Sequence, residues 1–371
     1  MSLHSPKTIL LVGLLLSLLL VACGGNNSND ASDNTDVTDN SDVSDGGDTT
    51  DGSDTTDGGD TTDGGDATDG DDTTDNSNNG DNSSSVYVAD HLVATEAVLR
   101  AIPDSYIDTA RTTLHIAYNH TSHGTHVSYG IYGLPDYKEG DASKFAITRN
   151  ALADPAKLDF HDNEIGGAYQ DLSQADADWM SWRYQVRAYL DDPANAGINV
   201  MIWSWCDIAG HSVADYLSSM QTLIDEYGTG GSKIGSEVGH TRTEPVTFIF
   251  MTGHANVGSN TGEGNPRDQA ALITDYCNSH SYFCIDYYAI DSHAMDGSYY
   301  EDVGDNGNSA SYGGNFYEDW QNEHLVNTDW YENRTTPGGT IRYGEHNTQH
   351  ITANRKAYAF WWVLARIVGY Q

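Results

Sequence analysis

The chain has 371 residues, of which 17 are Lys or Arg and 55 are Asp or Glu, so its formal net charge is -38. This excess of negative charge argues against a nucleic acid or an anionic membrane surface as a partner. Charged residues make up only 19% of the chain, so the charge must be concentrated in part of the sequence.

The first residues have the pattern of a secretory signal. Lys7 precedes a predominantly apolar run over residues 9–22, which has the length of a signal-peptide core and is short for a membrane span. The run ends in Leu20-Val21-Ala22-Cys23, which resembles a bacterial lipobox. The resemblance implies a signal peptide over residues 1–22, acylation of Cys23 and anchoring by membrane lipid in the bacterial cell envelope, at the outer membrane or cell surface. An ordinary secretory peptide is the alternative.

Residues 23–85 form an acidic, low-complexity segment. They contain 18 Asp and no Lys or Arg, and an Asp recurs at every third position from Asp30 to Asp75. The segment has no apolar face whose burial would offset the entropy of ordering it, and its charges repel one another. It is therefore predicted to be a disordered, extended tether. Calcium-binding repeats are the alternative, although the repeat lacks the apolar position that stacks such repeats into a β-helix.

Residues 86–371 carry 16 basic and 37 acidic side chains and are numerous enough for one large domain. Short β-branched or aromatic runs alternate with helix-period segments, which predicts a three-layer α/β fold with a mainly parallel sheet, as in flavodoxin-like proteins. Strands are expected at residues 114–118, 199–205, 246–251 and 283–287. Helices are expected at residues 91–102, 175–190, 213–227, 267–278 and 353–368.

The domain has three cysteines, in a compartment where disulfides can persist. Cys277 and Cys284 flank a predicted helix–strand junction, so a local bridge that leaves Cys206 free is one expectation. A bridge from Cys206 to either of them is the other. A catalytic role for Cys206 is disfavoured because it follows a strongly apolar run.

Polar residues and glycines follow each predicted strand, where open α/β sheets bind their ligands. This pattern predicts a functional site at the carboxyl edge of the sheet. The segments are His120-Thr121-Ser122-His123-Gly124-Thr125-His126 after the first strand, Ser204-Trp205-Cys206-Asp207 after the second, Thr252-Gly253-His254-Ala255-Asn256 after the third, and Asp286, Asp291 and His293 after the fourth.

The first of these segments supports three interpretations. Ser122 could be a nucleophile, given a base and N–H donors for the oxyanion. It could instead cap the helix that begins near Thr125. His120, His123 and His126 could also be zinc ligands, because their spacing would place them along one side of a helix.

The segment before the last helix offers the base. Gly344-Glu345-His346-Asn347-Thr348-Gln349-His350 places two histidines where either could project over the sheet edge.

Taken together, these segments resemble those of the SGNH (GDSL-type) hydrolases. The resemblance implies that Ser122 is the nucleophile, His350 the base, and that Ser122, Gly167 (or Gly166) and Asn256 form the oxyanion hole. Asn347 stands where the family has the Asp that orients the base, so Glu345 or Asp291 is an alternative, and His346 is an alternative base. The residues before Ser122 are not Gly-Asp, and Gly253-His254-Ala255-Asn256 is one residue longer than the usual Gly-x-Asn. Residues 113–369 also resemble an uncharacterised group of secreted bacterial SGNH-like lipoproteins, through His-Thr-Ser-His-Gly, Trp203-Ser204-Trp205-Cys206, Met251-Thr252-Gly253-His254 and Asn354-Arg355-Lys356-Ala357.

The first hypothesis is therefore a surface-anchored serine esterase that acts on esterified carbohydrate, without a metal or other cofactor. Its aromatic residues could stack on sugar rings, and its acidity favours neutral glycans. The second is a polysaccharide lyase or metal-dependent enzyme that uses His123, His126 and Tyr129 in acid–base chemistry, and His254 is a further alternative catalytic residue. The third is a glycan-binding lipoprotein without catalytic activity.

Overall fold

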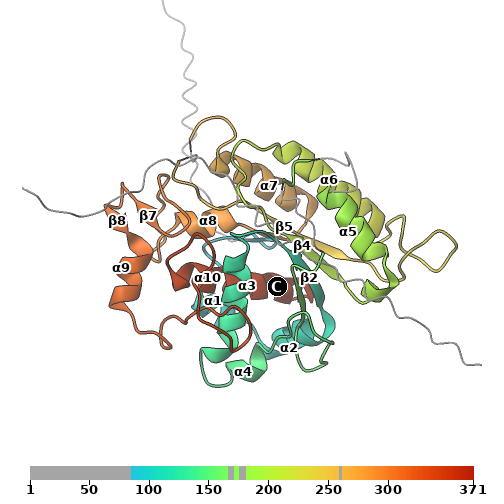
Figure 1. The fold of residues 1–371 in the computed structure, drawn as a ribbon, viewed down its shortest axis with the longest axis horizontal. Helices are drawn as coiled ribbons and strands as arrows, with labels where there is room; N and C mark the ends of the chain where they lie inside the picture. Colours follow the sequence, from blue (N-terminus) through green and yellow to red (C-terminus); the bar gives the residue numbers. More distant parts are fainter. Residues whose placement is uncertain (1–84, 166–170, 175–180, 259–260) are drawn as a thin grey trace, which may run out of the picture. The chain divides into compact units, whose positions relative to one another are not determined.

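The computed structural model describes residues 85–165, 171–174, 181–258 and 261–371. The predicted signal peptide, Cys23 and almost all of the tether lie outside these ranges. Within them, six parallel strands form one sheet with helices on both faces, which confirms the predicted three-layer α/β fold (Figure 1). In sheet order the strands are β1 (Val88–Ala89), β6 (Cys284–Ile285), β5 (Thr247–Met251), β4 (Val200–Trp203), β2 (His115–Asn119) and β3 (Asp159–Asp162).

The central strands are buried on both faces because their side chains alternate between two cores. In β4, Val200 and Ile202 belong to one core cluster, whereas Met201 and Trp203 belong to the other. The register pairs Ile116 of β2 with Val200 of β4. Continuous apolar strands of this kind require a layer of helices on each side.

One helical layer consists of α5 (Trp182–Asp191), α6 (Val213–Tyr227) and α7 (Pro266–His280). The other contains α1 (Glu96–Ala101), α2 (Asp104–Thr113), α3 (Thr125–Gly133), α4 (Asp141–Lys144) and α10 (His350–Ile367) (Figure 1). α8 (Tyr287–Ser292) and α9 (Phe316–Glu323) lie near the amino-terminal end of α10. Every residue of α10 from His350 to Ala365 is buried, so this helix lies inside the domain.

The predicted elements are mostly confirmed, with shifted ends. α6 has the predicted bounds, and α10 begins three residues earlier than predicted, at His350. α1 is shorter than predicted because the Thr95 side chain caps it by accepting a hydrogen bond from the Val98 N–H. The predicted helix at residues 175–190 is present from Trp182 onward; residues 175–180 lie outside the described residues.

Several elements were not predicted, for identifiable reasons. β3 is an edge strand with the sequence Asp-Phe-His-Asp. It has a single apolar residue, so it lacks the apolar run by which the other strands were predicted. β1 has two residues and gains its stability from pairing with β6. The strand predicted at residues 283–287 ends at Ile285, because the Asp286 side chain caps α8 through the Ala289 N–H.

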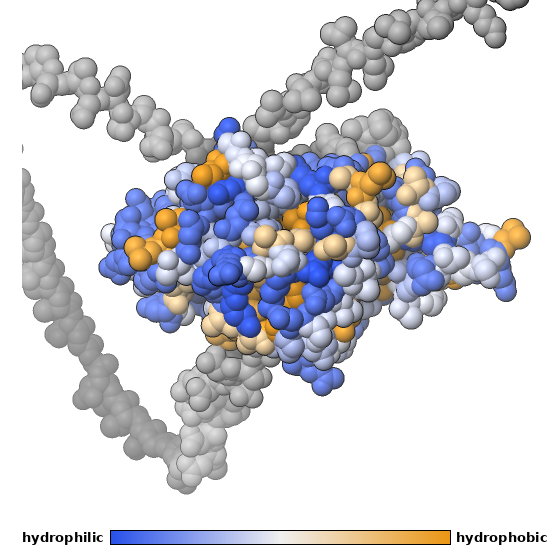
Figure 2. All heavy atoms as spheres, turned by 90° about the horizontal axis from the view of Figure 1, so that it is seen from below, coloured by the Kyte–Doolittle hydropathy of each residue, from blue (hydrophilic) through white to orange (hydrophobic). Residues whose placement is uncertain are grey.

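One face of the domain can be described from its surface residues. The face shown in Figure 2 is mainly hydrophilic, and its hydrophobic residues lie in small, separate groups. Among the described helices, none is long and apolar enough to cross a bilayer.

None of the three disulfides considered for Cys277 and Cys284 is formed, so both expectations were wrong. Both residues are buried free thiols on α7 and β6 in one apolar cluster. Burial, together with the neighbouring Cys277, raises the pKa of the Cys284 thiol well above its ordinary value. These side chains therefore act as small apolar packing groups.

We expect Cys277 and Cys284 to resist iodoacetamide in the folded protein and to react fully in denaturant without a reductant. The reason is that both are buried thiols whose attack requires unfolding. Mass spectrometry of the two peptides measures the modification. Peptides that stay unmodified in denaturant until a reductant is added would contradict the assignment.

Candidate active site

The loops that follow β2, β4 and β5 meet at the carboxyl edge of the sheet, as predicted. The His123 ring, after β2, stacks on the His254 ring, after β5, with ring centroids 3.7 Å apart and an interplanar angle of 7°. The Cys206 sulfur, after β4, lies 3.8 Å from both Ser122 Oγ and His123 Nδ1. Parallel strands bring their carboxyl ends to one edge, so residues far apart in sequence share one site.

Three imidazoles stack in this site. His346, from the loop before α10, also stacks on His123, with ring centroids 4.8 Å apart and an interplanar angle of 27°. Burial lowers the pKa of His123 and of His254, and neighbouring imidazoles contribute to both shifts. His123 and His254 are therefore neutral at neutral pH, which favours stacking.

The tautomer of His254 is set by its surroundings. Its Nδ1 lies 2.7 Å from the carbonyl oxygen of Ala255, which can only accept, so Nδ1 carries the proton. The buried Nε2 then presents a lone pair, and it has no hydrogen-bond partner among the described residues. The negative charge of Asp207 opposes the lowering of the His254 pKa and would stabilise the imidazolium. His254 thus has the protonation state and tautomer of a general base.

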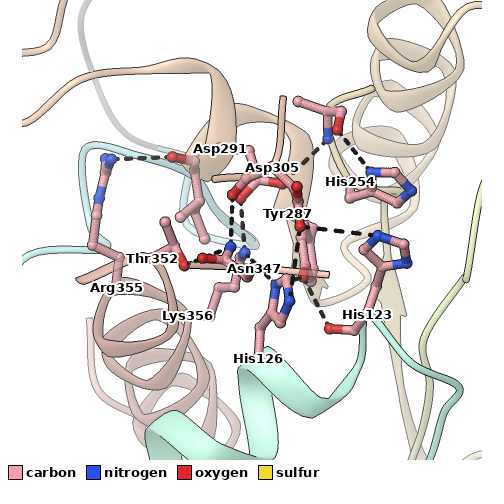
Figure 3. A network of polar contacts seen from close by, with 12 residues as sticks. His123, His126, His254, Tyr287, Asp291, Asp305, Asn347, Thr352, Arg355 and Lys356 are labelled. Carbon is pink, nitrogen blue, oxygen red and sulfur yellow. Dashed lines mark hydrogen bonds and ion pairs between the residues drawn. The ribbon is translucent and has the colours of Figure 1, made fainter. Parts of the chain in front are cut away.

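A buried network lies beneath the stack (Figure 3). Lys356 of α10 pairs with Asp291 of α8 at 2.7 Å, and both side chains are fully buried. The Lys356 ammonium also lies 3.3 Å from His126 Nδ1 and 3.7 Å from the centre of the Tyr287 ring. Burial lowers the pKa of Lys356 and raises that of Asp291 to about 6, and the pairing opposes both shifts.

His126 is hydrogen-bonded to the loop that carries His346. Its Nδ1 accepts a hydrogen bond from the Tyr287 hydroxyl or the Lys356 ammonium, so Nε2 carries the proton and donates to the Glu345 carbonyl at 2.6 Å. Burial and Lys356 hold the pKa of His126 well below its usual range, which keeps this neutral tautomer.

Asp305 is a buried carboxyl group beside the stack. Its Oδ2 lies 3.9 Å from His123 Nε2 and 3.8 Å from His126 Nε2, and it has no hydrogen-bond partner among the described residues. Burial and the charge of Asp291 raise its pKa to about 8, so it is largely protonated at neutral pH. In that state it can donate a hydrogen bond into the site.

His120, His123 and His126 do not form the metal site that their spacing suggested. α3 begins only at Thr125, so the three residues do not share a helix face. His120 binds Asp162 at 2.8 Å, and both nitrogens of His126 are hydrogen-bonded. The planes of His123 and His254 are nearly parallel, so their lone pairs do not converge on one point. No group of three or more His, Cys, Asp or Glu in the described part of the chain is arranged to hold a metal ion.

His350 lies apart from this stack. Its Nδ1 accepts a hydrogen bond from the Asn333 N–H at 3.2 Å, and its ring packs beside Tyr343 and Trp330. It lines a pocket of about 720 Å³ whose lining does not include Ser122. Asn347 does not orient His350. Its side chain donates to the Asp305 carbonyl and to Thr352 Oγ1, and accepts from the Gln349 N–H, just before α10 begins.

The remaining predicted site residues are distributed as follows. The Asn256 amide donates to Asp207 Oδ2 at 3.0 Å. Tyr129 and Glu345 line the same pocket as His350. Gly166 and Gly167 lie outside the described residues. The backbone N–H groups of His123 and Gly124 donate to no acceptor in the described ranges, which leaves two donors beside Ser122.

Sequence reasoning missed Lys356, Tyr287 and Asp305 as parts of this site. The signal for Lys356 was present, because three consecutive polar residues, 354–356, interrupt an otherwise apolar helix. Asp305 lies in a Gly/Asn-rich loop with no pattern that distinguishes it.

Comparison of the chain with protein-family models, curated proteins and solved structures finds no match. The functional assignment therefore depends on the site itself.

We expect Lys356→Met to lower the free energy of unfolding by about 3–5 kcal/mol, because it leaves the buried Asp291 carboxyl without its cation. Chemical denaturation followed by tryptophan fluorescence measures this change. The double variant Lys356→Met/Asp291→Leu should recover part of the loss. Lys144→Met, which removes the partly buried partner of the exposed Asp104 carboxylate, is the control and should change stability little. Equal effects of the two single variants would contradict the interpretation.

Proposed function

We propose that this protein is a serine hydrolase that cleaves esters, with Ser122 as the nucleophile. One observation supports this most directly: Ser122 lies on the loop after β2, next to the neutral, stacked imidazoles of His123 and His254 and to two backbone N–H groups without acceptors among the described residues. A nucleophile, a base and oxyanion donors are the three elements that acyl transfer requires.

In this proposal His254 is the general base, rather than His350. Its Nε2 lone pair is available, and its ring is held against His123, the residue after Ser122. His254 would take the Ser122 proton as the hydroxyl attacks the ester carbonyl, and would return it to the leaving alcohol. Water would then attack the acyl-enzyme with the same base. The N–H groups of His123 and Gly124 would stabilise the oxyanion of each tetrahedral intermediate.

The proposed substrate class is an esterified, uncharged carbohydrate outside the cell. The excess of acidic over basic residues disfavours polyanionic substrates, and the predicted lipid anchor at Cys23 would hold the enzyme in the cell envelope. The SGNH resemblance agrees with this assignment in the position of Ser122 after a strand of a parallel sheet, and differs in the base.

We expect Ser122→Ala to reduce kcat for 4-nitrophenyl acetate by about 10³-fold or more, because it removes the nucleophile. It should also abolish labelling by a fluorophosphonate probe, which mass spectrometry would locate on Ser122 in the native chain. Ser143→Ala is the control, since Ser143 is exposed on α4 and its hydroxyl donates to the carbonyl of the nearby Gly140. Full activity and labelling in Ser122→Ala would reject the serine mechanism.

The pH dependence provides a test of the base. Because burial lowers the pKa of His254, the neutral, active form should persist below pH 6.5, and the acidic limb of kcat/KM should lie below that value. Steady-state rates from pH 4 to 8 measure the limb. His254→Asn should lose both the activity and this limb. A limb above pH 7 that survives in His254→Asn would require a different base.

A further inference from the structure

The pocket that contains His350 is lined by none of the stacked histidines and has no role in the chemistry proposed above. Its volume is about 720 Å³, which is large enough for one or two sugar rings. The lining residues that carry charged or aromatic side chains are Tyr129, Glu332, Arg342, Tyr343, Glu345 and His350, and Thr335 adds a hydroxyl group.

His350 offers a hydrogen-bond donor in this pocket. The Asn333 N–H donates to its Nδ1, so the neutral ring carries its proton on Nε2. Burial and the nearby Arg334 lower the pKa of His350 to about 4, so this form persists at neutral pH. The ring is held between Tyr343 and Trp330, with centroids 4.4 and 5.7 Å away. A fixed donor of this kind suits binding better than proton transfer.

The rest of the lining combines donors, acceptors and aromatic surface. Arg342 is a donor, Glu332 and Glu345 are acceptors, and the Tyr129 hydroxyl can be either. Tyr343 is 46% exposed, so part of its ring is open to a ligand. An acyl chain would desolvate these charged groups without pairing them. A polyanion would meet two carboxylates. A ring with several hydroxyl groups and an apolar C–H face satisfies both the polar and the aromatic surfaces.

The pocket is joined to the Ser122 loop through one segment. Glu345 lines the pocket, while its carbonyl accepts from His126 and its N–H donates to Thr125 Oγ1 at 2.9 Å, both in the first turn of α3. Gly344 makes this contact possible, because its φ is +117° and a Cβ there would lie 2.4 Å from His126 Cδ2. The pocket wall is therefore hydrogen-bonded to the first turn of α3, the helix that directly follows the Ser122 loop.

We propose that this pocket is a subsite for an uncharged sugar ring of the substrate, with Tyr343 as its stacking surface and His350 as a neutral donor. The inference rests on the proposed function, because the sugar would carry the ester that Ser122 cleaves.

The experiment compares the native chain with Tyr343→Ala. Because Tyr343 is 46% exposed, we expect this variant to fold, and circular dichroism checks the fold. The first readout is the ratio of kcat/KM for acetylated xylo-oligosaccharide to that for 4-nitrophenyl acetate. We expect this ratio to fall about tenfold. The second is calorimetric binding of unacetylated xylo-oligosaccharide to Ser122→Ala and to Ser122→Ala/Tyr343→Ala, where affinity should fall by a similar factor. Tyr343→Phe, which keeps the ring, should retain most of both.

The outcomes separate the subsite from the hydrolase. An unchanged ratio and affinity in Tyr343→Ala, with Ser122-dependent turnover of 4-nitrophenyl acetate intact, would overturn the subsite alone. Binding of xylo-oligosaccharide that depends on Tyr343, without turnover of either ester, would support the subsite and reject the hydrolase. Tighter binding of oligogalacturonate than of xylo-oligosaccharide would overturn the assignment to uncharged sugars.

Discussion

The architecture depends on three consecutive polar residues, Asn354, Arg355 and Lys356, inside a helix that is buried on all sides. None of their side chains is more than 2% exposed, so each must find partners within the protein. Asn354 binds the backbone of Tyr331, Arg355 donates to backbone carbonyls of the α8 region, and Lys356 pairs with Asp291. An apolar helix could slide or rotate in its site with little penalty. These three side chains permit one position, because any displacement would leave a buried donor without an acceptor.

The same contacts extend to both halves of the proposed active site. Lys356 contacts His126, which holds the loop of His346 through the Glu345 carbonyl. Asn354 donates to Asn333 Oδ1 at 3.0 Å, and the Asn333 N–H sets the tautomer of His350. The side chains that fix the position of α10 therefore also position His126 and His350. The site is preorganised by burial, which also keeps His123 and His254 neutral although the protein as a whole is strongly acidic.

The sequence was sufficient for the fold class because the relevant signals are local. The apolar runs of β2, β4 and β5 and the period of α6 can be recognised in short windows. The edge strands β1 and β3 were not predicted, because their stability comes from pairing with a neighbouring strand that lies far away in the sequence. The same limit explains the cysteines: two residues on either side of a junction suggested a bridge, whereas the packing of α7 on β6 left both as buried thiols.

For the site, the sequence by itself determined the edge at which it forms, since polar residues follow every central strand and parallel strands end together. It also supplied Ser122, His123 and His254 as members. Only the tertiary structure decided which imidazoles stack, that His350 turns toward Asn333, and that Lys356 reaches the network. The imidazole stack and the Lys356 contact join segments more than 80 residues apart, and even His350 and Asn333 are 17 residues apart. Which partner a buried polar group meets, and so its tautomer and charge, is a property of the packed core rather than of neighbouring residues in the chain.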